Sequence, residues 1–75
     1  MSELPILSGK EIIKVLSKIG YKAVRQRGSH IRLHCENKKP ITIPNYKSID
    51  RSLLRKVLRD AQISVEEFLE FYKST

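Results

Sequence analysis

Residues 21–35, YKAVRQRGSHIRLHC, decide how the chain folds. Two runs of strand-forming residues flank Gly28-Ser29, and glycine at the first of two central positions is typical of a type II′ hairpin turn. A two-residue turn at this point places Arg27 opposite His30 on the neighbouring strand. The stretch therefore predicts a β-hairpin with a defined register.

Alternation along the two strands then divides the hairpin into two faces. The outer, solvent-facing side carries the cationic side chains Arg25, Arg27, His30 and Arg32. The inner face is apolar, and we expect it to bury Val24, Ile31, Leu33 and Cys35. If this register continues unbroken away from the turn, we expect four further pairs: Arg25 with Arg32, Val24 with Leu33, Ala23 with His34 and Lys22 with Cys35.

Apolar residues at helical spacing define the elements around the hairpin. They predict a helix over residues 9–19, a third strand over 41–44, and helices over 51–61 and 65–72. The first and last helices each begin at a capping box, Ser8 with Glu11 and Ser64 with Glu67. The predicted fold class is α+β: a three-stranded antiparallel sheet with helices on one face, in the order α-β-β-β-α-α.

Length and charge limit what the protein can do. A chain of 75 residues buries only ~60% of its unfolded surface, so we expect a single domain, residues 1–75, without a sizeable pocket. Between Lys10 and Arg59 there are 14 basic and three acidic residues, a net charge of +11, whereas residues 60–75 carry −3. This excess favours a polyanionic partner over the alternative that the lysines only keep a small protein soluble.

The composition argues against a membrane or secreted protein. The single cysteine makes no internal disulfide and suits a reducing compartment. No apolar run approaches the ~20 residues of a membrane helix, and the N-terminus shows no secretory signal. We therefore expect a cytoplasmic protein without a membrane partner.

The candidate chemistry is confined to a few residues. His30, His34 and Cys35 do not form a zinc-binding pattern, and the two histidines stand ~13 Å apart along a strand. No glycine-rich phosphate loop is present, so we expect neither a metal nor a small-molecule cofactor. His30 is the one side chain well placed for proton transfer, since imidazole serves as a base near neutral pH. The alternative is a surface histidine on a basic sheet without a catalytic role.

Three segments together carry a family resemblance over most of the chain. They read LSGKEIIKVLSKIGYKAVRQRGSHIRLH (7–34), ITIPN (41–45) and SLLRKVLRDAQISVEEFLEF (52–71). The sequence resembles the HicA toxin family of type II toxin–antitoxin modules, also called YcfA-like proteins. The most specific part is the triplet Gly28-Ser29-His30, which follows closely on an Arg-Gln pair.

The resemblance implies an mRNA interferase with a double-stranded-RNA-binding-domain-like fold, in which His30 is catalytic. It also implies an mRNA substrate and a larger HicB-like antitoxin that covers the site. Two positions differ from the usual family pattern. Tyr46 follows Pro44-Asn45 where many members have histidine, and Arg51-Ser52 stand where many have Gly-Thr.

These residues permit cleavage of RNA without a metal. His30 would remove the proton from a 2′-hydroxyl, while Arg27 and Arg32 stabilise charge on the phosphate oxygens. The acid that protonates the leaving 5′-oxygen stays open among Tyr46, His34, a lysine and water. The RNA-binding residues expected on this basis are Arg25, Arg27, Gly28, Ser29, Arg32 and Tyr46.

Two other classes of function compete with the nuclease. In the first, the same fold is a non-catalytic RNA-binding module, and His30 only contacts phosphates. In the second, the helix over 51–61 enters a DNA major groove with a line of arginines: Arg51, Arg55 and Arg59. Such a line is more often a solvated helix face.

Overall fold

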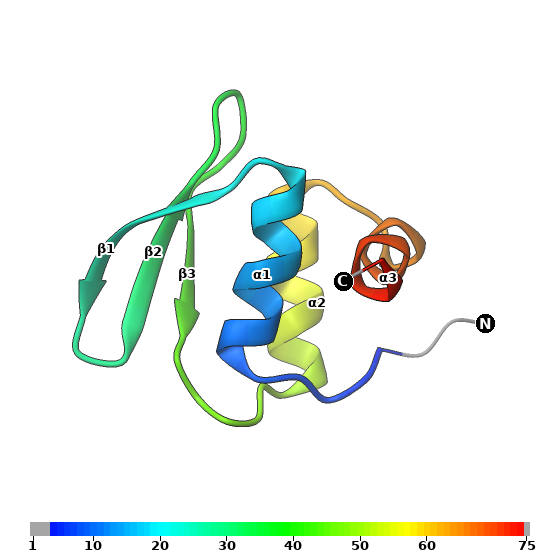
Figure 1. Cartoon of the computed structure of the whole chain (residues 1–75), viewed down its shortest axis with the longest axis horizontal. Helices are drawn as coiled ribbons and strands as arrows, with labels where there is room; N and C mark the ends of the chain where they lie inside the picture. The colour runs from blue at the N-terminus through cyan, green and yellow to red at the C-terminus, as the bar shows by residue number, and fades with distance from the viewer. Residues whose placement is uncertain (1–3, 75) are drawn as a thin grey trace.

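The computed structural model describes residues 4–74, and the order of its elements is the predicted one (Figure 1). Helix α1 spans Gly9–Ile19. Three strands follow: β1 (Lys22–Arg27), β2 (His30–His34) and β3 (Ile41–Pro44). Two helices come last: α2 (Arg51–Ala61) and α3 (Val65–Lys73).

The sheet and the helices form separate layers. The strands run antiparallel in the order β1-β2-β3, which confirms the predicted α+β class. In Figure 1, α1 and α2 lie between the sheet and α3, and each of them contacts both β3 and α3. The sheet contacts the helices mainly through β3. The β1–β2 hairpin therefore projects beyond the helical layer, and all six residues of β1 are exposed.

The core fills the space between β3 and the helices. Its residues come from every layer and from the segments between them. They include Ile12, Val15 and Leu16 of α1, Leu33, Ile41 and Ile43 of the sheet, Leu54, Val57, Leu58 and Ala61 of α2, Phe68 of α3, and Leu4, Leu7 and Ile49 outside the helices and strands. Within residues 4–74 no polar or charged side chain is buried. Each large apolar side chain buried in this way contributes about 1.5–3 kcal/mol. Leu33 of β2 is one of them, whereas β1 contributes no buried side chain.

Tyr21 belongs to this core, although its sequence context predicts the start of a strand. Its side chain is buried, and its hydroxyl donates a hydrogen bond to the carbonyl oxygen of Lys39 at 2.9 Å. Burial raises the pKa of the Tyr21 phenol above its ordinary value of 10.0, with smaller contributions from Cys35 and Asp60. The bond ties the loop between β2 and β3 to the exit of α1.

The hairpin has the predicted register next to its turn. Arg27 pairs with His30, Gln26 with Ile31, and Arg25 with Arg32. Gly28 has a φ of +59°, whereas Ser29 is not among the residues with positive φ, as a type II′ turn requires. Leu33 is buried as predicted, and Ile31 is half-buried against the core.

Further from the turn the predicted register is wrong by one residue. A β-bulge lies between Ala23 and Arg25, so that Ala23 pairs with Leu33 and Lys22 with His34. Val24 is the extra residue of the bulge and has no partner on β2. Its side chain is 56% exposed, which overturns the expectation that Val24 is buried. The bulge and the position of β1 beyond the helices both contribute to this exposure.

Both predicted capping boxes are present. In the first, the Ser8 hydroxyl accepts from the Glu11 backbone N–H at 3.1 Å, and the Glu11 carboxylate accepts from the Ser8 N–H at 2.9 Å. Ser64 and Glu67 form the same pair of bonds, each at 3.0 Å. These bonds satisfy backbone donors that the first turn leaves free, which explains why α1 and α3 begin where the sequence predicts.

Helix α1 begins directly against the end of β3. The backbone N–H of Gly9 donates to the carbonyl oxygen of Tyr46 at 2.9 Å. A Cβ atom on Gly9 would overlap the carbonyl oxygen of Pro44 and would lie 3.1 Å from the Cα atom of Asn45. The close approach of helix and strand therefore requires glycine at this position.

Gly9→Ala is expected to lower the free energy of unfolding by about 1–3 kcal/mol, because the added methyl group collides with backbone atoms of β3. Urea denaturation measures the change as a lower midpoint. Lys14→Ala, at an exposed position of the same helix, is the control and should change stability by no more than about 0.5 kcal/mol. Equal stability of Gly9→Ala and the unmodified protein would contradict the tight contact.

Candidate nucleic-acid interface

The outer face of the sheet carries a shallow depression, which we call the hairpin depression. Residues of all three strands line it: Val24, Arg25, Arg27, His30, Arg32, His34 and Thr42. Every one of these residues is exposed. The structure thus brings together the four cationic residues that the sequence places on the outer face.

Local backbone geometry explains how these side chains meet. Alternation along β2 puts His30, Arg32 and His34 on one face of the sheet. The turn at Gly28 sets Arg27 opposite His30. Thr42 is the β3 partner of Arg32 and therefore shares its face.

The positive charge of the hairpin depression is not neutralised by acidic side chains. No Asp or Glu is among the residues that line it. Arg25 and Arg27 form neither an ion pair nor a side-chain hydrogen bond with any residue in the described range 4–74. Arg32 is oriented by one bond, from Nη1 to the Thr42 hydroxyl at 3.0 Å. Three guanidinium groups that face solvent without carboxylate partners favour the binding of a polyanion.

His30 lies between two of these arginines. Arg27 is its partner across β1–β2, at about 4.5–5.5 Å between Cα atoms in such pairs. Arg32 stands two residues along the same strand, about 6.6 Å away. An exposed imidazole in this position can take a proton from a ligand while the guanidinium groups stabilise the negative charge that develops.

Tyr46 lies outside the hairpin depression. It lines a separate hollow, the Tyr46 hollow, together with Ser8, Lys10, Asn45 and Lys47. A hydrogen bond of 2.6 Å from the Asn45 N–H to the Ser29 carbonyl oxygen joins this loop to the hairpin turn. Of the expected RNA-binding residues, Arg25, Arg27 and Arg32 therefore line the hairpin depression and Tyr46 lines its own hollow. Gly28 and Ser29 form the turn beside them and line neither.

The comparisons with known proteins decide the family. Residues 9–63 match a family model described as the HicA toxin of bacterial toxin–antitoxin systems. This chain belongs to the HicA toxin family. Comparisons with curated proteins and with solved structures give no match.

Membership in the HicA family gives the protein its general role. It is the toxin of a bacterial toxin–antitoxin pair, which implies an antitoxin as its partner. The matched segment contains every residue of the hairpin depression and every residue of the Tyr46 hollow except Ser8, whereas α3 lies beyond it.

Val24 and Thr42 line the depression in this HicA-family protein but were not among the expected site residues, and His34 was considered only as a possible acid. Thr42 could have been found by extending the alternation along β3. Val24 could not have been found in this way, because no residue pattern in β1 predicts the bulge at this position.

The arginine line on α2 is interrupted. Arg51 is half-buried, and its Nε donates to the carbonyl oxygen of Leu4 at 2.6 Å. Arg55 and Arg59 are exposed. The first arginine of the line thus fastens the N-terminal segment to α2, which weakens the hypothesis that this helix face enters a DNA groove.

Two further observations concern the described residues 4–74 of this HicA-family protein. No three His, Cys, Asp or Glu side chains there come together as a candidate metal site. None of the helices is long and apolar enough to span a membrane.

RNA affinity is expected to fall steeply with salt, with a slope of log K against log[salt] of about −0.7 per phosphate neutralised. A 2′-O-methyl RNA, which resists attack by its own 2′-oxygen, serves as the ligand. Replacing Arg25, Arg27 and Arg32 together by glutamine should make the slope shallower by about 2.

The matched control replaces Arg55 and Arg59 of α2, which are exposed but lie outside both sites, and should leave most of the slope in place. Affinity that hardly changes with salt would remove the argument for a polyanion at the sheet.

Proposed function

We propose that this HicA-family toxin is a metal-independent endoribonuclease that cleaves mRNA, with His30 as the general base. The single observation that carries the proposal is the position of His30 on an open face between Arg27 and Arg32, without a carboxylate in the depression. Together these groups supply a base and the charge stabilisation that a transesterification at phosphorus requires.

In the proposed reaction, His30 accepts the proton of a ribose 2′-hydroxyl. The 2′-oxygen forms a bond to the adjacent phosphorus, and the bond from phosphorus to the 5′-oxygen breaks. Arg27 and Arg32 stabilise the charge that accumulates on the phosphate oxygens, and Arg25, Gly28 and Ser29 contact the RNA backbone beside them. The departing 5′-oxygen takes a proton from water, which has free access to this exposed face. General base catalysis of this kind contributes ~10²–10⁴-fold.

The proposed biological setting follows from the family. The substrate is mRNA in the cytoplasm, and a HicB-like antitoxin covers the hairpin depression to silence the toxin. An acidic partner surface would suit this face, since its three arginines lack carboxylate partners in the described chain. The whole sequence, residues 1–75, acts as one RNA-binding and ribonuclease domain without a small-molecule cofactor.

One observation favours a second candidate, a non-catalytic RNA-binding module of the same fold. Within residues 4–74 no group forms a hydrogen bond with the His30 ring. Catalytic histidines are commonly held in position by a third group that fixes the tautomer and the direction of the ring. In this alternative His30 only contacts phosphate.

His30→Ala separates the two candidates. We expect it to abolish measurable cleavage, a loss of ~10²–10⁴-fold, while RNA binding persists. Stability should change by no more than about 0.5 kcal/mol, because His30 is exposed and packs little. Single-turnover cleavage, RNA binding and urea denaturation are the three measurements.

His34→Ala is the matched control, since His34 lines the same depression but stands ~13 Å along the strand from His30. It should reduce cleavage much less. Cleavage by His30→Ala at the rate of the unmodified protein would reject the nuclease mechanism and support the binding module.

Substrate chemistry provides an independent test. A 2′-deoxy or 2′-O-methyl group at the cleaved position should block cutting, because the attacking oxygen belongs to the substrate. Products should carry a 2′,3′-cyclic phosphate, and chelators should not inhibit. Efficient cleavage of a 2′-deoxy linkage would contradict the proposed reaction.

A further inference from the structure

The Tyr46 hollow combines an aromatic residue with lysines, the two kinds of side chain that bind single-stranded RNA. Tyr46 is 51% exposed. Lys10 of α1 and Lys47 of the following loop line the same hollow and are both exposed, and no Asp or Glu lines it. Proteins bind unpaired nucleotides by stacking bases on aromatic rings while cationic side chains contact the adjoining phosphates.

The backbone that carries the ring is held on both sides. The Asn45 N–H donates to the Ser29 carbonyl oxygen at 2.6 Å, and the Tyr46 carbonyl oxygen accepts from the Gly9 N–H at 2.9 Å. The close packing at Gly9 leaves no room for even a methyl group between α1 and the end of β3. An exposed aromatic residue on an anchored backbone loses little conformational freedom when a base stacks on it.

The hollow is also close to the proposed site of cleavage. Pro44 is the β3 partner of His30, and Tyr46 follows two residues later. Cross-strand and chain spacings limit the separation of the His30 and Tyr46 Cα atoms to about 13 Å. A short RNA strand can therefore reach both places at once.

We propose that the Tyr46 hollow is a second nucleotide subsite of the RNA path, distinct from the hairpin depression. A base close to the cleaved linkage stacks on the Tyr46 ring, and Lys10 and Lys47 contact its flanking phosphates. The inference rests on the proposed function and deepens it, because it makes cleavage depend on nucleotides outside the scissile pair. An RNA that extends into the hollow is bound more tightly than a dinucleotide.

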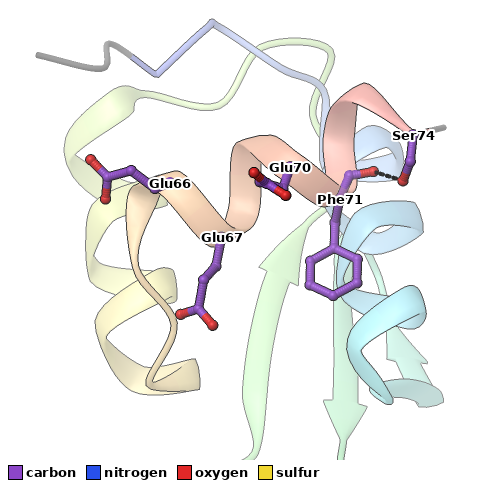
Figure 2. Close-up of a pocket in the computed structure, with 5 residues that line it drawn as sticks. All are labelled: Glu66, Glu67, Glu70, Phe71 and Ser74. Carbon is purple, nitrogen blue, oxygen red and sulfur yellow. Dashed lines mark hydrogen bonds between the residues drawn. The ribbon is translucent and has the colours of Figure 1, made fainter.

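The other exposed aromatic residue in a hollow lacks these properties. Phe71 on α3 lines a hollow together with Glu66, Glu67 and Glu70, whose carboxylates are spread along the same helix (Figure 2). Acidic side chains repel phosphate, so this part of the surface does not continue an RNA path. Phe71 is therefore a suitable control for an exposed aromatic residue in a hollow lined by carboxylates.

The test measures binding of a short 2′-O-methyl RNA, so that the result does not depend on cleavage. Tyr46→Ala should weaken binding by about 5- to 150-fold, the range for loss of one stacked base. Tyr46→Phe, which keeps the ring, should bind as the unmodified protein does. Phe71→Ala should leave affinity within about twofold, because its surroundings are acidic.

Removal of bases one at a time from the RNA identifies the stacked nucleotide. We expect one position at which an abasic site weakens binding to the unmodified protein but has no further effect on Tyr46→Ala. Lys10→Gln with Lys47→Gln should make the salt slope shallower by about 1.4, for two phosphates released.

The outcomes distinguish the subsite from the nuclease. If Tyr46→Ala binds normally while cleavage still requires His30, the subsite is rejected and the nuclease stands. If His30→Ala cleaves normally while the Tyr46 effect is present, the nuclease is rejected and the hollow belongs to an RNA-binding surface.

Discussion

The two-residue turn at Gly28-Ser29 is the constraint on which the functional surface depends. The positive φ of Gly28 lets the chain reverse within two residues, and this reversal places Arg27 beside His30. Because side chains alternate between the faces of a strand, a shift of one residue near the turn would send His30 and its arginines toward the helices. The bulge at Val24 has no such effect, since it lies beyond the pairs that carry these side chains.

The core and the exposed cationic side chains of the sheet occupy different parts of the molecule. The core lies between β3 and the helices, whereas β1 is exposed along its whole length. Exposed cationic side chains on the hairpin therefore interrupt no packing, and an edge strand that carries arginines resists pairing with other chains. The two parts meet at the end of β3, where backbone bonds connect Asn45 to the turn and Tyr46 to α1.

The opposite charges of the molecule are also separated in space. The hairpin depression carries three arginines, and α3, on the far side of α1 and α2 from the sheet, carries Glu66, Glu67 and Glu70 (Figure 1). A polyanion is attracted to one side and repelled from the other, so the charge distribution favours approach of a polyanion to the sheet. Helix α3 lies outside the segment that matches the HicA family, and the basic surface lies within it.

The sequence by itself determined those features that depend on neighbouring residues. Capping boxes at Ser8 and Ser64 and apolar spacing defined the helices, and Gly28 defined the turn and the pairs next to it, because caps and turns are local interactions. Tertiary structure alone decided the exposure of Val24 and the burial of Tyr21. Val24 is exposed because it lies in a bulge and because the helices contact the sheet mainly at β3. Tyr21 is buried, and its hydroxyl bonds to Lys39 in the loop between β2 and β3. Tertiary structure also placed Tyr46 in its own hollow beside α1, since that position depends on hydrogen bonds between segments far apart in the chain, which residue patterns do not encode.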